Sequence, residues 1–206
     1  MRYAASILFL AFAVVVPSFA ESVDVGAPVS GDFEYAVCNF PIPKCESWLA
    51  QEFSLSGATR VDSISIGMAF GAGTFDFLLT NGLTSGATIF SSATFSDFSG
   101  PVSLGPTTLG PGTYFLIAEI QQGGKGGWDG SNGVTVTNGG TVSSGFFQSV
   151  DKGLEWTNQP FGCESQCGAL APLQFEVLGA PVPEPSTLLL FLSGLAGLRV
   201  TFFRRK

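Results

Sequence analysis

Residues 64–79, with the sequence ISIGMAFGAGTFDFLL, decide the fold class of the chain. Every second residue from 64 to 70 is large and apolar, and the same alternation resumes from 75 to 79 after a glycine-rich break at 71–73. A period of two places successive side chains on opposite faces of a β-strand. The stretch therefore predicts two strands that each turn one face toward a core.

Similar short runs fill the rest of the body and are separated by turn residues. Further candidate strands are 52–55, 88–95, 113–120, 134–137, 146–150 and 173–178. Asn-Gly pairs and glycine clusters between these runs supply the positive φ of tight reversals. Residues 113–120 are apolar at nearly every position and predict a central strand buried on both faces, whereas 173–178 alternate and predict a half-exposed strand. No helical period interrupts residues 21–178, so we expect an all-β, two-sheet antiparallel sandwich there.

The charge of this body restricts its partners. Between Glu21 and Val182 there are 4 basic and 15 acidic residues, a net charge of −11. Nucleic acids and anionic lipid surfaces carry the same sign, so neither is an expected partner of the body. The 20 phenylalanines and the charged fraction of only 12% also exclude a disordered chain.

The chain contains no histidine, which excludes a Ser-His-Asp site, a Cys-His site and any His-ligated metal. We therefore expect no catalytic residues, no metal and no cofactor. An enzyme built from this chain would depend on carboxylates, as paired-carboxylate glycosidases do. Candidates for such a pair are Asp76, Glu119, Asp129, Glu155 and Glu176. Glu119 stands out near the end of a very apolar strand, although a structural role is the simpler interpretation.

The N-terminus has the layout of a secretory signal peptide. Arg2 precedes an apolar stretch at 4–16, and a small-x-small tripeptide ends at Ala20. We expect residues 1–20 to be removed. An uncleaved membrane helix is the alternative, but the 13 apolar residues are few for a span that needs about 20.

The C-terminus reads as a membrane segment behind a proline-rich linker. Residues 179–185 form the linker, 186–203 form an 18-residue apolar run interrupted by Arg199, and 204–206 are basic. As a helix, 18 residues span about 27 Å, close to the hydrocarbon core of about 30 Å. Arg199 lies near enough to one end to reach the headgroups, and the basic tail marks the cytoplasmic side. Both ends then face the cytoplasm, and the body between them is exported.

Pro183, Glu184 and Pro185, followed by an apolar segment and a basic end, resemble the PEP-CTERM sorting signal of Gram-negative bacteria. The resemblance implies that an exosortase, a membrane-embedded cysteine protease or transpeptidase, recognises the Pro-Glu-Pro segment. It also implies that the protein is exported, transiently anchored through its C-terminal helix, and then located at the cell surface or in a polysaccharide matrix. The early position of Arg199 departs from the usual pattern and leaves the length of the membrane segment open.

The body between Trp48 and Trp128 is also loosely similar to jelly-roll carbohydrate-binding modules in the order of its sequence pieces. This second resemblance implies a jelly-roll-like sandwich and transfers no functional residue. Together the two resemblances favour a surface or biofilm-associated protein that is structural or binds carbohydrate. The alternatives are a glycan hydrolase that uses carboxylates and an unprocessed, membrane-anchored periplasmic protein.

The four cysteines occur as two local pairs, Cys38 with Cys45 and Cys163 with Cys167. An even number in an exported protein predicts disulfides, and three connectivities are open. We favour the two local bridges, with pairing between the first and last strands as the alternative. A zinc site is disfavoured because six residues separate Cys38 from Cys45, more than the usual two to four.

The glycine-rich segment at 123–133 is the candidate ligand site of the body. A sugar ring could stack on Trp128 while Asp129 and Asn132 form hydrogen bonds with its hydroxyls. Oxygen atoms from Asp129 to Asn132 could alternatively bind calcium, although the segment lacks the further acidic positions of an EF-hand loop. The simpler interpretation is a glycine-rich hairpin with Trp128 packed over the edge of the sandwich.

Overall fold

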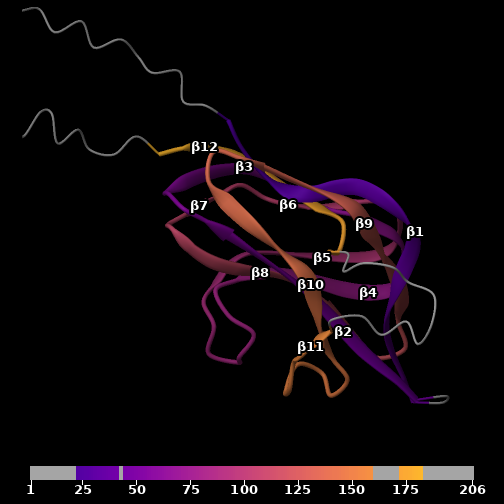
Figure 1. Cartoon of the computed structure of the whole chain (residues 1–206). Helices are drawn as coiled ribbons and strands as arrows, with labels where there is room; N and C mark the ends of the chain where they lie inside the picture. The colour runs from indigo at the N-terminus through magenta and orange to yellow at the C-terminus, as the bar shows by residue number, and fades with distance from the viewer. Residues whose placement is uncertain (1–21, 42–43, 160–171, 183–206) are drawn as a thin grey trace, which may run out of the picture.

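The described part of the chain folds entirely into antiparallel β-structure. The computed structural model describes residues 22–41, 44–159 and 172–182 (Figure 1). Its strands are β1 (Val23–Pro41), β2 (Lys44–Leu55), β3 (Thr59–Ile66), β4 (Met68–Thr80), β5 (Ile89–Ser99), β6 (Val102–Leu104), β7 (Thr107–Leu109), β8 (Gly112–Ile120), β9 (Lys125–Thr137), β10 (Gly140–Ser149), β11 (Thr157–Gln159) and β12 (Phe175–Pro181). The expectation of an all-β antiparallel fold is confirmed for these residues.

The predicted terminal segments lie outside the described residues. They are the signal peptide at 1–20, the Pro-Glu-Pro motif at 183–185, the membrane helix at 186–203 and the basic tail at 204–206. Within the described residues, no helix is both long and apolar enough to span a bilayer. These segments therefore stay predictions from the sequence.

The strands form two layers around one core. One layer has the order β5-β4-β8-β2-β10-β11, and the other has the order β9-β1-β12-β3, with β6 and β7 both paired to β3. In Figure 1, β3, β6 and β12 lie above β4 and β8. The aromatic rings of Phe53 on β2 and Phe175 on β12 meet between the layers, with their centroids 5.6 Å apart. The arrangement is that of a sandwich, and its jelly-roll character stays a prediction.

Long strands join the two layers. β4 pairs with β8 through residues 75–80 and with β9 through residues 68–72. β1 pairs with β9 along most of its length and with β2 through residues 38–41. The pairings β1–β2–β8–β4–β9–β1 thus form a closed circuit, so backbone hydrogen bonds run continuously from one layer to the other.

The break in the stretch at 64–79 falls at Gly67, not at the glycine-rich triplet 71–73 as expected. Gly67 alone separates β3 from β4, and its N–H donates to the carbonyl of Gln174 at 2.9 Å. A Cβ at Gly67 would lie 2.4 Å from the side chain of Gln174, so a larger residue would have to displace that side chain from its hydrogen bond with Pro28. The triplet 71–73 instead bends β4, whose register with β5 shifts there and whose Gly73 has a φ of 87°.

Two strand predictions are confirmed in detail. β8, which contains the run 113–120, lies between β2 and β4 and buries the consecutive residues 116–118. β12 alternates between buried and more exposed positions, as expected for 173–178.

The longest strand, β1, is absent from the sequence prediction. Its 19 residues include two glycines and two prolines that interrupt any apolar period. The register between β1 and β9 shifts repeatedly between Gly26 and Glu34. The alternation of side chains between the two faces of β1 is therefore interrupted within a single strand. A pattern search that requires a steady period of two does not find such a strand.

Replacing Phe53 by alanine tests the core between the layers. Phe53 is 1% exposed and its ring contacts those of Tyr114 and Phe175, so we expect a loss of about 3–5 kcal/mol in unfolding free energy. Phe70→Ala is the matched control, because Phe70 is 40% exposed, and it should cost less than about 1 kcal/mol. Denaturant unfolding measures both, and equal losses would contradict a core centred on Phe53.

Candidate functional site

Trp128 is a core residue, so the expected sugar stacking on its ring is wrong. The side chain is 0% exposed, and its indole N–H donates to the carbonyl of Gln174 at 2.8 Å. The neighbouring glycines serve close packing, because a Cβ at Gly126 would lie 2.6 Å from the ring of Phe75 on β4. Residues 125–137 are the long strand β9 and not a hairpin loop, which explains why the indole is carried into the core.

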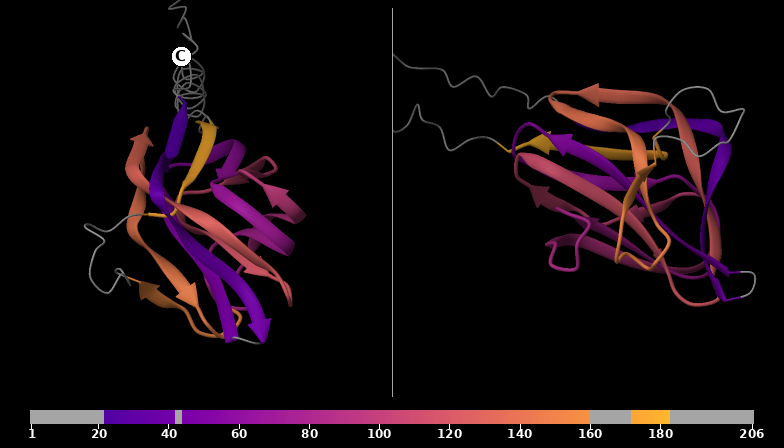
Figure 2. Two further views of the ribbon diagram at one scale, coloured as in Figure 1. Left: turned by 90° about the vertical axis from the view of Figure 1, so that its right-hand side faces the viewer. Right: turned by 60° about the horizontal axis from the view of Figure 1, so that its bottom comes forward.

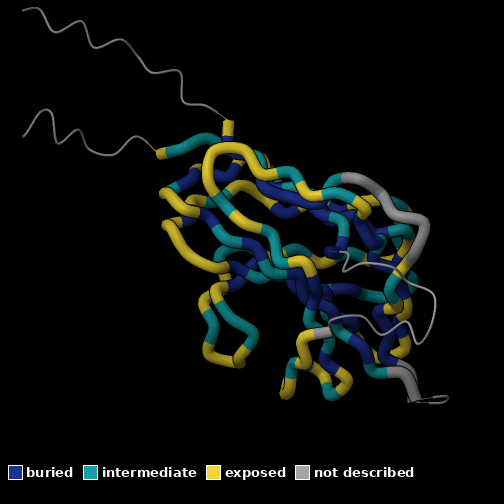
Figure 3. Tube along the Cα trace, viewed as in Figure 1, coloured by how far each residue is buried: buried dark blue, intermediate teal, exposed yellow. Residues whose placement is uncertain are grey.

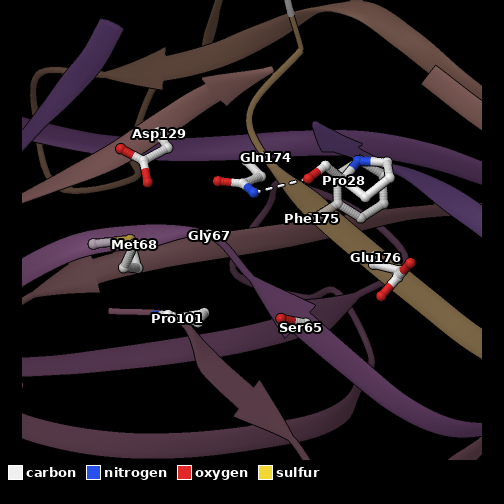
Figure 4. Close-up of a pocket in the computed structure, with 9 residues that line it drawn as sticks. All are labelled: Pro28, Ser65, Gly67, Met68, Pro101, Asp129, Gln174, Phe175 and Glu176. Atoms are coloured by element: carbon white, nitrogen blue, oxygen red, sulfur yellow. Dashed lines mark hydrogen bonds between the residues drawn. The ribbon is translucent and has the colours of Figure 1, made fainter. Parts of the chain in front are cut away.

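Asp129 and Asn132 do not join Trp128 in one site. Asn132 is exposed, while Asp129 is half-buried and faces a separate pocket of about 400 Å³, shown in Figure 4. Burial, and then the carboxylate of Glu34 opposite it on β1, raise the pKa of Asp129. No three Asp, Glu or Cys side chains gather as a metal site in the described residues, so the calcium alternative gains no support.

The pocket at Asp129 is crossed by a glutamine side chain that is already engaged. Gln174 donates its amide N–H to the carbonyl of Pro28 at 2.9 Å, as the dashed line in Figure 4 shows. Its backbone N–H also donates to the carbonyl of Asp129 at 2.7 Å. Gln174 therefore ties β1 and β9 to the start of β12, and we interpret this pocket as structural.

A second cavity has the composition of a binding site. It measures about 350 Å³ and lies between the β4–β5 loop and the β10–β11 loop, on the face of β4 and β8 that points away from the core. Figure 2 shows both loops projecting from the same side of the molecule, and Figure 3 shows that their tips are largely exposed. We call this cavity the loop cleft. Among the residues that line it are Trp48, Leu78, Ile117, Glu119, Lys152, Leu154 and Trp156.

The floor of the loop cleft explains why residues 113–120 are apolar throughout. Ile117 lies opposite Leu78 on β4 and Ala50 on β2. It is only 4% exposed, yet it does not belong to the core cluster between the layers. The outer face of β8 is therefore covered by side chains and loops around the cleft. One face of the strand is apolar because it packs into the core, and the other because it forms the floor of the cleft.

The β10–β11 loop is ordered by short polar contacts. The hydroxyl of Ser149 accepts the N–H of Gly153 at 2.7 Å and donates to the carboxylate of Asp151 at 2.7 Å. The same carboxylate accepts the N–H of Glu155 at 2.9 Å, and this contact, followed by the Ser149 hydroxyl, lowers the pKa of Asp151. Lys152 and Gly153 have φ values of 61° and 81°, so the chain reverses sharply.

This loop holds two indole rings at the cleft. A Cβ on Gly153 would lie 2.9 Å from the ring of Trp48 and 3.8 Å from that of Trp156. The indole N–H of Trp156 donates to the carbonyl of Gly153 at 3.2 Å, which fixes that ring relative to the loop. The indole N–H of Trp48 is buried and meets no acceptor in the part of the chain that the structure describes. The loop geometry therefore fixes the aromatic wall of the cleft.

A pair of carboxylates lies at the edge of the cleft. Asp76 on β4 is directly opposite Glu119 on β8. Asp76 accepts hydrogen bonds from Thr94 at 2.5 Å and from Gln121 at 3.3 Å. Glu119 lines the cleft, and burial, followed by the charge of Asp76, raises its pKa. Sequence reasoning singled out both residues, but only the strand register brings them together.

Lys152 is the cation that lines the loop cleft, and it is already paired. Its ammonium group lies 3.9 Å from the carboxylate of Glu46 on β2. Burial and Asp76 are the causes of the raised pKa of Glu119, so Lys152 does not neutralise that carboxylate. The two charged residues that line the cleft are thus Glu119 and a lysine shared with Glu46.

The cysteine pairing stays a prediction. Cys38 is 3% exposed and disulfide-bonded, but the side chains of Cys45, Cys163 and Cys167 lie outside the described part. The β1–β2 register places Cys45 opposite Phe40 and Cys38 opposite Ser47, so the two cysteines are diagonal neighbours on adjacent strands. Diagonal neighbours lie about 7–8 Å apart at Cα, slightly more than most disulfides span.

Peptide mapping of the unreduced protein tests the cysteine pairing. We expect one cross-linked peptide within residues 38–45 and another within residues 163–167, and reduction should release both. A fragment that joins 38–45 to 163–167 would instead identify a bridge between the two ends of the body.

Replacing Glu119 by glutamine tests the carboxylate pair. A raised pKa in the folded protein means that folding favours the protonated acid, so this carboxyl lowers stability as pH rises above its ordinary value of 4.5. Glu119→Gln should therefore increase the unfolding free energy at about pH 8 by about 0.2–1 kcal/mol, and the gain should vanish at about pH 4. Glu52→Gln on the same face, opposite Phe115, is the control. A gain that does not depend on pH would contradict the pairing.

The comparisons with known proteins concern the end of the chain. No curated protein matches this chain significantly. Residues 181–206, however, match the PEP-CTERM protein-sorting motif, which contains the Pro183, Glu184 and Pro185 singled out in the sequence. The match begins at the last residue of β12 and leaves the β-structured body outside it. The chain thus carries a PEP-CTERM protein-sorting motif at residues 181–206, which supports an exported protein addressed to an exosortase.

Proposed function

We propose that the body is displayed at the cell surface or in an exopolysaccharide matrix after exosortase acts on the C-terminal signal, and that it serves there as a carbohydrate-binding or structural protein. The observation that carries the proposal is the position of the sorting motif directly behind the body. The acidic charge, the absence of histidine and the loop cleft are consistent with binding rather than chemistry.

The structure of β12 supports removal of the sorting signal without loss of the body. β12 pairs with β1 on one side and β3 on the other, so it is an interior strand of its layer. The N–H of Val182 donates to the carbonyl of Ala58 at 2.8 Å, immediately before the Pro-Glu-Pro segment. Cleavage beyond Val182 would therefore leave every described strand intact.

A second candidate function, glycan hydrolysis, is favoured by one specific observation. Directly opposite residues in a sheet have Cβ atoms about 4.5–5.5 Å apart, and retaining glycosidases use carboxyl groups about 5–5.5 Å apart. Asp76 and Glu119 occupy such opposite positions, and the raised pKa of Glu119 suits a general acid. However, Asp76 does not line the loop cleft and is engaged by Thr94 and Gln121. We therefore favour binding over hydrolysis.

Mass spectrometry of the protein from its native host tests the processing. We expect a mature N-terminus at Glu21 and a C-terminus upstream of Lys206, because the signal peptide and the sorting signal are both removed. A variant with Pro183, Glu184 and Pro185 replaced by alanine should retain Lys206 and stay in the membrane fraction. A wild-type chain intact through Lys206 would favour the unprocessed, membrane-anchored alternative.

Hydrolysis assays separate the two candidate functions. The mature protein should release no reducing ends from the polysaccharides with which it co-purifies. Turnover that is lost in Glu119→Gln but kept in Glu52→Gln would establish the carboxylate pair as catalytic and replace the binding proposal.

A further inference from the structure

We propose that the loop cleft binds a glycan chain built of pyranose units without acidic groups. The inference rests on the proposed function, for which it names the site and the ligand class. Four features of the cleft restrict the ligand. They are its cavity, its aromatic and apolar wall, the Glu119 carboxylate that receives no hydrogen bond from the described residues, and the further carboxylates nearby.

The shape of the cleft suits a short segment of a chain. Its volume of about 350 Å³ lies within the range of about 300–1,000 Å³ that is typical of ligand sites. The β4–β5 loop and the β10–β11 loop form its two walls, and the face of β4 and β8 forms its floor. A cavity that lies between two loops on a sheet face, rather than inside the core, gives access to a unit within a longer polymer.

The walls of the cleft offer apolar surface that is unusually exposed. Leu154, at the tip of the β10–β11 loop, is 84% exposed, and Ile89, at the start of β5, is 56% exposed. Trp156, two residues after Leu154, is the half-buried aromatic residue of the wall. A pyranose ring has an apolar face that packs on such side chains, and a ring already fixed by its hydrogen bond to Gly153 loses little entropy on binding.

The carboxylate of Glu119 in the cleft can accept a hydrogen bond from a ligand hydroxyl. Among the described residues, no hydrogen-bond donor reaches the carboxylate of Glu119, although it is half-buried and lines the cleft. A half-buried carboxylate without a donor is costly, and a sugar hydroxyl supplies one. Asp76 has donors from Thr94 and Gln121, so Glu119 is the member of the pair that is available to a ligand.

The charges around the cleft disfavour acidic glycans. Glu119 and the nearby Asp76 are carboxylates, Asp151 and Glu155 lie on the loop beside the cleft, and the one lysine that lines it is paired with Glu46. Uronate or sulfate groups would meet like charges here and have no free cation among these residues to pair with. Neutral sugars avoid this cost, and amine-bearing sugars should bind at least as well.

Isothermal titration of the mature protein with defined hexasaccharides tests the site. We expect cellohexaose or chitohexaose to bind, deacetylated chitohexaose to bind at least as tightly, and oligogalacturonate to bind at least about tenfold more weakly. Trp156→Ala should weaken neutral binding at least about tenfold. Val150→Ala is the matched control, because Val150 is 63% exposed at the base of the same loop and does not line the cleft.

Glu119→Gln supplies a readout that a merely structural role would not move. In Glu119→Gln, the affinity for neutral hexasaccharides should exceed the affinity for oligogalacturonate by a smaller factor than in the wild type. The reason is that the repulsive charge is lost while the side chain keeps its size. Thermal unfolding of each variant identifies losses that arise from misfolding. Affinity for the neutral hexasaccharides that is unchanged in both Trp156→Ala and Leu154→Ala would overturn the proposal. So would the failure of both the neutral hexasaccharides and deacetylated chitohexaose to bind at about 1 mM.

Two outcomes separate this inference from the proposed function. If the mature protein co-purifies with surface polysaccharide and Trp156→Ala does so equally, the site is wrong and the function stands. If hexasaccharides bind the cleft but the processed protein is not found with surface polysaccharide, the site stands and the function is wrong.

Discussion

The meeting of three chain segments at Gln174 is the constraint on which the rest of the structure depends. The carbonyl of Gln174 accepts the N–H of Gly67 at 2.9 Å and the indole N–H of Trp128 at 2.8 Å. Its own N–H and side-chain amide donate to Asp129 and Pro28. This one residue thus ties β1, β9 and the corner between β3 and β4 to the start of β12. Trp128 is fully buried and Gln174 is half-buried, so loss of the contact between them would leave a buried indole N–H without an acceptor.

The continuity of the layers follows from this junction. β9 passes close to both β1 and β4, which requires glycine where a Cβ would meet the ring of Phe75. The large indole of Trp128 then fills the space between the layers and is 0% exposed. A residue type that often marks a sugar-binding surface therefore serves the core here. The indole rings that line the loop cleft lie instead beyond the opposite face of β8, where a separate loop holds them.

The sequence identified the right residue types but not their grouping. Both Glu119 and Asp76 were candidates in the sequence, but only the β4–β8 register shows that they are directly opposite each other. Trp48 and Trp156 are more than a hundred positions apart, and Gly153 lies between their rings only because the β10–β11 loop turns back over β2. No local pattern encodes such contacts, because a period of two describes which face a side chain takes and not which strand lies beside it.

The sequence alone determined the fold class and the sorting signal. Alternating apolar residues specify strands through local geometry, and the Pro-Glu-Pro segment at 183–185 is read as a linear motif, so neither requires a tertiary neighbour. The tertiary structure alone decided the corner at Gly67, the burial of Trp128 and the position of the loop cleft. These features depend on strand pairings that join residues far apart in the chain, and register and close packing select them only when the whole sandwich has formed.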